Sequence, residues 1–122
     1  MQPSPTRRRA ALLLASVVSL PMPAAAHAIV ISAAPAVDTV LRSGSVPIEL
    51  RFNSRIDHER SRLMLLRPDG SALSLPLLAA ARPDTLVAKI DGLAPGSYRI
   101  RWQVLAVDGH ITRGDIPFAI GE

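Results

Sequence analysis

Hydrophobic and polar residues alternate along most of the chain from residue 28 onward, with the period of a half-buried β-strand. In the segment 47–53, PIELRFN, the residues Ile48, Leu50 and Phe52 share one face, and polar or charged residues share the other. The longest alternating run is 97–107, SYRIRWQVLAV, whose apolar face carries Tyr98, Ile100, Trp102, Val104 and Ala106. This pattern predicts strands that bury one face and expose the other.

Turn sequences separate these segments and set the fold class. Further strands are predicted at 28–34, 62–67, 73–77, 85–90 and 116–120. RPDGS and DGLAPGS lie between strands and contain the proline, aspartate and glycine residues that favour turns. About seven short strands with regular turns and no helical period predict an all-β, immunoglobulin-like Greek-key sandwich. The segment LAPGSY, ending at Tyr98, resembles the tyrosine corner of such sandwiches.

The first 26 residues have the organisation of a secretory signal peptide. Three arginines, residues 7–9, precede a short apolar run, and three alanines, residues 24–26, offer small side chains for cleavage. An uncleaved membrane anchor is the alternative, but the apolar run is shorter than the ~20 residues that span a bilayer. We therefore expect cleavage after Ala26, export of the protein, and one domain at 27–122 that begins with His27.

Charge and composition exclude several classes of function. The formal charge is +4, but residues 27–122 contain eleven basic and ten acidic residues. A near-neutral domain with four aromatic residues does not fit nucleic-acid binding. The chain has no cysteine, which excludes disulfides, thiolate metal sites and cysteine nucleophiles.

Two histidines and an aspartate form the candidate metal site. A histidine at the N-terminus offers its free amine and its Nδ1 to one metal ion, so cleavage before His27 would create a chelating ligand. Asp108 and His110 are two residues apart, so they share the inward-facing side of the strand if the extended conformation persists past 106. Three nitrogens and one oxygen suit tetragonal Cu(II), which also has the highest affinity of the divalent series. The alternative is that Asp108-Gly109 is simply a turn and His110 an exposed turn residue.

Three segments together resemble the CopC family of periplasmic copper-resistance proteins: HAIVISAAPA, IELRFNSRI and PGSYRIRWQVLAVDGHITRG. The resemblance covers essentially all of 27–122. It implies a seven-stranded Greek-key sandwich that binds one Cu(II) through His27, Asp108 and His110. It also implies partnership with a CopD-like inner-membrane copper transport protein, with no insertion of this chain into the membrane after cleavage.

This chain departs from the family pattern at two places. Some members carry a glutamate near the copper where this chain has Ser54. Some also carry a methionine-rich loop for Cu(I), whereas Met64 is the single methionine of 27–122 and lies on an expected core strand. We therefore predict a protein that binds Cu(II) and has no separate Cu(I) site.

His58 and Trp102 are the remaining residues whose part in a metal site has to be judged. His58 is either an auxiliary ligand or, as we favour, a residue of a solvated loop, and Trp102 is expected in the core.

A copper-dependent oxidative enzyme of the histidine-brace type is an alternative function, but the domain is short and offers little aromatic surface for a polysaccharide. A metal-free interaction module is the other alternative. We predict a binding protein and not an enzyme.

Overall fold

A computed structural model describes residues 2, 16 and 28–122 of the chain. The expected signal peptide at 1–26 falls outside the described residues except for Gln2 and Ser16, and His27 also lies outside them. Among the described residues there is no helix able to cross a membrane.

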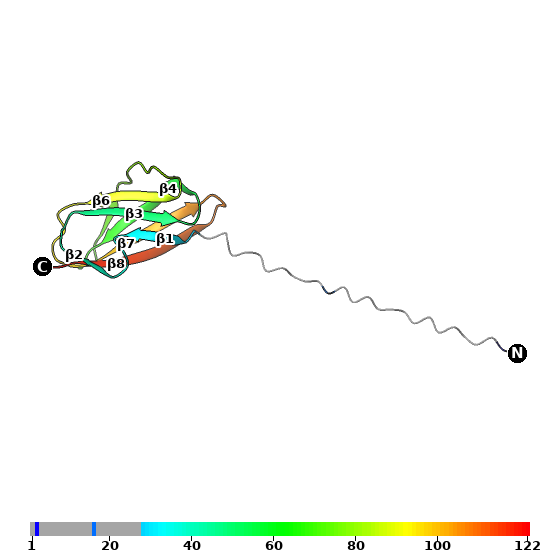
Figure 1. The fold of residues 1–122 in the computed structure, drawn as a ribbon, viewed down its shortest axis with the longest axis horizontal. Coiled ribbons are helices and arrows are strands. Elements are labelled where there is room, and N and C mark those ends of the chain that lie inside the picture. The colour runs from blue at the N-terminus through cyan, green and yellow to red at the C-terminus, as the bar shows by residue number, and fades with distance from the viewer. Residues whose placement is uncertain (1, 3–15, 17–27) are drawn as a thin grey trace.

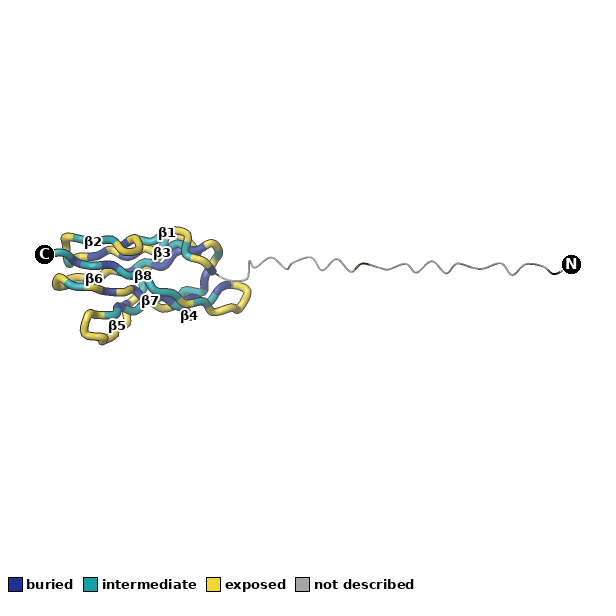
Figure 2. Tube along the Cα trace, turned by 90° about the horizontal axis from the view of Figure 1, so that it is seen from below, coloured by how far each residue is buried: buried dark blue, intermediate teal, exposed yellow. Residues whose placement is uncertain are grey.

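Two β-sheets pack face to face as a sandwich, with the buried residues between the layers and the exposed ones outside (Figures 1 and 2). The smaller sheet has the order β1-β3-β6, and the larger has the order β2-β8-β7-β4-β5. The prediction of an immunoglobulin-like β-sandwich is confirmed. The eight strands are β1 (Val30–Ala34), β2 (Thr39–Leu41), β3 (Val46–Phe52), β4 (Ile56–Leu66), β5 (Ala72–Leu75), β6 (Thr85–Ile90), β7 (Gly96–Ala106) and β8 (Ile111–Ile120).

The predicted inward faces form the core. Ile48, Leu50 and Phe52 of β3 are at most 1% exposed. The five apolar positions of β7 and the alternate residues Ile116, Phe118 and Ile120 of β8 are all buried as well. Alternation in the sequence therefore identified the side of each long strand that faces the opposite sheet.

Tyr98 makes the predicted tyrosine corner. Its hydroxyl donates a hydrogen bond of 2.6 Å to the carbonyl oxygen of Ala94, four residues upstream. The Tyr98 ring stacks on Phe118 with centroids 5.6 Å apart. This contact fixes the connection from β6 to β7, the strand that leads to the candidate site.

The sequence pattern missed one strand and placed the starts of two others too late. The eighth strand, β2, was missed: it has three residues and pairs in parallel with the end of β8. β4 begins at Ile56 and not at residue 62, and β8 begins at Ile111 and not at residue 116. The segment 57–61 has the polar composition of a loop. It nevertheless belongs to β4, where it interrupts the register with β7.

Candidate metal centre

The segment 107–110 is the loop of the hairpin formed by β7 and β8. The backbone N–H of Ala106 donates to the carbonyl of His110 at 2.9 Å, and that of Gly109 donates to the carbonyl of Ala106 at 2.9 Å. Gly109 has φ +87°, a left-handed conformation that side-chain-bearing residues rarely adopt. The chain reverses here, so the extended conformation on which a shared strand face depended does not persist past 106. As in the alternative given above, Asp108-Gly109 forms a turn and His110 is an exposed residue of it.

The turn nevertheless brings Asp108 and His110 into contact. Asp108 Oδ1 accepts a hydrogen bond of 3.0 Å from the backbone N–H of His110. Asp108 Oδ2 lies 3.3 Å from His110 Nδ1. The pair meets through a side-chain-capped turn and not through the shared face of a strand. Both residues are exposed at the rim instead of facing the core.

Hydrogen bonding favours the charged form of Asp108. The N–H of His110 donates to the carboxylate and lowers the pKa of Asp108 below its usual value of 3.8, and the nearby His110 ring adds to the effect. Asp108 is therefore a carboxylate at neutral pH. One of its oxygens holds the turn, and the other lies beside an imidazole.

A second turn in the same chain has the same construction without a histidine. Asp69 accepts a hydrogen bond of 2.9 Å from the backbone N–H of Ser71, across Gly70 with φ +85°. Asp-Gly turns of this kind are therefore a structural device in this fold. What distinguishes the loop at 107–110 is the imidazole beside the carboxylate.

The first described residues of the domain lie at the same rim (Figure 1). Ala28 is buried, and its carbonyl oxygen accepts a hydrogen bond of 3.2 Å from the hydroxyl of Thr112, two residues past His110. The next residue, Ile29, exchanges two hydrogen bonds with Asn53 at the end of β3, at 2.8 and 2.9 Å. These bonds hold the start of the domain beside the start of β8.

Within residues 28–122, no group of three or more metal-ligating side chains comes together. The described part of the predicted site is thus the pair Asp108 and His110, with His110 55% and Asp108 34% exposed. A complete tetragonal copper site needs further donors. The prediction for His27 concerns a residue outside the described part of the chain.

The prediction that His58 lies in a solvated loop is wrong. Among the described residues it also does not join His110 in a group of metal-ligating side chains. It lies on β4, half buried, with Nε2 2.7 Å from the carbonyl oxygen of Thr85 on β6. This bond occupies Nε2 and fixes the ring across the two sheets. His58 and Glu59 also line a surface hollow of about 540 Å³ beneath the segment 77–83.

Trp102 and Met64, the other residues singled out from the sequence, are not part of the contact between Asp108 and His110. Trp102 is a core residue, as predicted, with its ring edge-to-face on Phe52 at 5.3 Å. Met64 lies on β4, as expected, but it is half buried while its neighbours Leu63 and Leu65 form the core.

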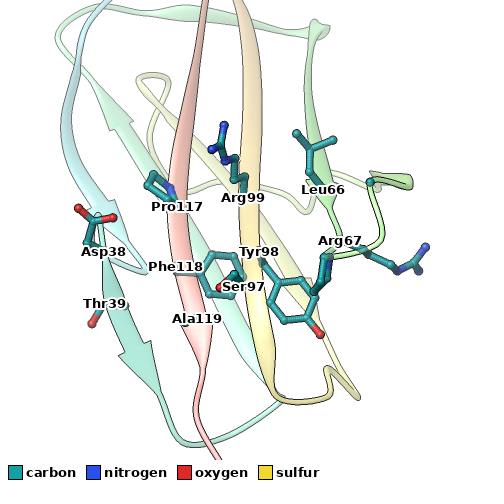
Figure 3. A pocket seen from close by; sticks show the side chains of 12 residues that line it. Asp38, Thr39, Leu66, Arg67, Ser97, Tyr98, Arg99, Pro117, Phe118 and Ala119 are labelled. Atoms are coloured by element: carbon teal, nitrogen blue, oxygen red, sulfur yellow. The ribbon is translucent and has the colours of Figure 1, made fainter.

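A larger shallow cavity (Figure 3), of about 570 Å³, lies beside the start of β7 and the end of β8. The 107–110 loop joins the other ends of these two strands. Tyr98 and Phe118 line it together with two arginines, Arg67 and Arg99. Its lining contains one carboxylate, Asp38, and no histidine, so it does not have the donors of a copper site.

Comparison with known proteins shows the family of the domain. Residues 30–121 match the family model of the CopC domain. The chain is 25% identical over 114 residues to the copper transport protein CutJ of Bacillus subtilis, covering 91% of this chain but only 21% of CutJ. The chain therefore spans about a fifth of that relative's length.

Solved structures of the same kind superpose well. CopC from Methylosinus trichosporium OB3b matches 78% of this chain and 94% of its own, with 26% identity and a TM-score of 0.72. PcoC, a methionine-rich copper resistance protein from Escherichia coli, matches 78% of this chain and 99% of its own, with 22% identity and a TM-score of 0.62, a likeness of fold.

Proposed function

The chain belongs to the CopC family, and we propose on this basis that it is a periplasmic Cu(II)-binding protein that sequesters copper or delivers it to a CopD-like inner-membrane protein. It is a copper resistance or transport protein of that family and not an enzyme. The observation that carries the proposal is the contact between Asp108 and His110 at the rim where the domain begins.

The ligand set that we propose is the amine and Nδ1 of His27, a nitrogen of His110 and an oxygen of Asp108. His27 is bonded to Ala28, which is held beside β8, and consecutive Cα atoms are about 3.8 Å apart. The hydrogen bond from Thr112 to Ala28 supports this, because it lies two residues from His110. Signal-peptide cleavage after Ala26 frees the amine, and the set of three nitrogens and one oxygen binds one Cu(II) per chain.

Each residue of the loop has a distinct part in this site. Gly109 allows the reversal, and Asp108 Oδ1 holds the turn through the N–H of His110. Asp108 Oδ2 and the His110 ring then lie on one side of the loop, with the carboxylate already charged. The exposure of both side chains leaves the bound ion accessible, as transfer to a membrane partner requires.

The chemistry of the domain favours Cu(II) over Cu(I). Cu(I) prefers soft thioether ligands, and Met64 is the single methionine of residues 27–122. Met64 is also half buried within β4, far in sequence from the hairpin loop. We therefore propose that the protein has no separate Cu(I) site.

A matched pair of histidine variants tests the site. Cu(II) titration followed by visible absorption is expected to saturate at about one equivalent in the unmodified protein. His110→Ala removes a ligand nitrogen and abolishes tight binding, whereas His58→Ala leaves it intact because Nε2 of His58 is occupied by a carbonyl. Tight binding retained in His110→Ala, or lost equally in both variants, contradicts the proposed site.

A further inference from the structure

The outer face of the five-stranded sheet carries a concentration of positive charge. Four exposed arginines project from it, and we call them the arginine face: Arg62, Arg99, Arg101 and Arg113. Asp115 is the one acidic residue among their neighbours on β7 and β8. Asp57 of β4, which lies opposite the outward-facing Leu105, is a second carboxylate on this face. The net charge of these six residues is therefore +2.

The register of the sheet places these side chains in rows. Arg62, Gln103 and Arg113 lie opposite one another across β4, β7 and β8. Arg113 donates to Gln103 at 2.8 Å, which holds its guanidinium along the sheet. In the next row Arg101 forms two hydrogen bonds with Asp115, at 2.9 and 3.0 Å.

Arg99 lies in the third row, between Leu66 and Pro117 (Figure 3). Its side chain is 61% exposed and approaches Asp115 no closer than 3.7 Å. Successive rows along a strand are about 7 Å apart and neighbouring strands about 4.8 Å apart. The four guanidinium groups thus spread over a broad, nearly flat surface instead of meeting in a pocket.

The charge of the domain is unevenly divided. The outer face of the larger sheet holds these four of the eleven basic residues of 27–122 but only two of the ten acidic residues, Asp57 and Asp115. The remainder of the domain carries seven basic and eight acidic residues, a net charge of −1. Such a distribution orients the protein toward an anionic surface with this one face.

We propose that the arginine face docks the protein peripherally on the anionic phospholipid headgroups of a membrane, without insertion. Guanidinium groups bind phosphate through paired hydrogen bonds, and a flat array of them matches a surface of many phosphates. The hairpin of β7 and β8 carries three of the four arginines and ends in the 107–110 loop. Docking therefore holds that loop close to the bilayer surface, whether or not copper is bound.

Vesicle co-sedimentation in the absence of copper tests this inference separately from the copper site. The probes are vesicles of pure phosphatidylcholine and vesicles of equal parts phosphatidylcholine and phosphatidylglycerol. A net charge of +2 at the surface gives binding roughly 30-fold tighter to the anionic vesicles. Rising salt weakens this binding, because the interaction is between exposed charges.

Two double variants of equal charge separate the face from net charge alone. Arg62→Gln/Arg99→Gln removes two arginines of the face and weakens anionic binding by roughly 30-fold. Arg42→Gln/Lys89→Gln removes two exposed charges elsewhere, one after β2 and one on β6, and largely retains it. Neither double variant touches Asp108 or His110, so Cu(II) binding is unchanged in both.

Three results overturn the inference. The first is equal affinity of the unmodified protein for the two kinds of vesicle. The second is an equal loss in both double variants, which would mean that any positive charge suffices. The third is binding to polyglutamate with no binding to anionic vesicles, which would assign the face to an acidic protein.

Discussion

Asp108→Asn isolates the charge of the candidate site from its shape. In the unmodified protein the backbone N–H of His110 donates to Asp108 Oδ1 at 3.0 Å. Asparagine keeps a side-chain oxygen that can accept this hydrogen bond, so the turn is retained. What disappears is the negative charge at Oδ2, the oxygen 3.3 Å from His110 Nδ1. The variant therefore removes an anionic ligand without unfolding the loop.

The magnitude follows from exposure and distance. The Asp108 side chain is 34% exposed, so a water-like dielectric constant is appropriate. A unit charge about 4 Å from a divalent ion in that medium changes affinity by roughly 30-fold. Loss of a residue that hydrogen-bonds to a ligand in other metal sites costs about 10- to 100-fold in metal affinity, a range that brackets this value.

Asp69→Asn is the matched control. Asp69 caps an Asp-Gly turn of the same geometry but has no histidine at the third position. Competition titration against a Cu(II) chelator is expected to show about 30-fold weaker binding for Asp108→Asn and no change for Asp69→Asn. Equal Cu(II) affinity in the two variants would refute a role for the Asp108 carboxylate in the site.

Three further predictions concern the pH dependence and the frame of the site. Cu(II) affinity falls as the pH drops from 8 to 5, because the amine, with a reference pKa of about 8, and the imidazole nitrogens bind the ion only in their unprotonated forms. Because the pKa of Asp108 is lowered, its carboxylate stays charged throughout this range, and its contribution to Cu(II) affinity is lost only below the usual pKa of 3.8. Asp108→Asn therefore keeps the same pH profile of Cu(II) affinity between 5 and 8 in a chelator titration. Tyr98→Phe removes the 2.6 Å bond to Ala94 and lowers the free energy of unfolding in urea by about 1–3 kcal/mol, with unchanged Cu(II) affinity; unchanged stability would contradict the tyrosine corner. Gly114→Ala places a methyl group against the indole of Trp102, costs about 1–3 kcal/mol in the same urea assay and shifts the tryptophan emission, whereas an unperturbed emission would contradict this packing.

Alternation predicted the long strands because burial of one face is a local property of sequence. Ile48, Leu50 and Phe52 are buried where the pattern of 47–53 placed them. The strand containing Trp102 was likewise predicted to within one residue at each end. The short strand β2 was missed because three residues cannot show a period, and its parallel pairing with β8 is a tertiary contact.

The start of β4 was missed because its polar residues make hydrogen bonds both within the segment and to a neighbouring strand. Asp57 Oδ1 accepts the backbone N–H groups of Glu59 and Arg60, at 3.0 and 3.1 Å. The Ser61 hydroxyl accepts the N–H of Leu105, 44 residues away in sequence. Such bonds allow a charged segment to remain in a strand, and the composition of the segment does not reveal them.

For the site, sequence identified the residues but not how they meet. The prediction that Asp108 and His110 lie together is confirmed as a contact, but the reason given for it was wrong, because Gly109 turns the chain. The anchor between Thr112 and Ala28 joins residues 84 positions apart and had no signature in the sequence. The part assigned to His27 stays a prediction that depends on cleavage after Ala26.

The amine ligand of His27 is the central claim, and electron paramagnetic resonance of Cu(II) tests it most directly. The protein beginning at His27 is compared with the same protein carrying one additional residue before His27, which converts the amine into an amide. We predict a single tetragonal, nitrogen-rich signal that saturates at about one equivalent in the first protein and is clearly weakened and altered in the second. Identical signals and affinities in the two proteins would contradict the proposed site.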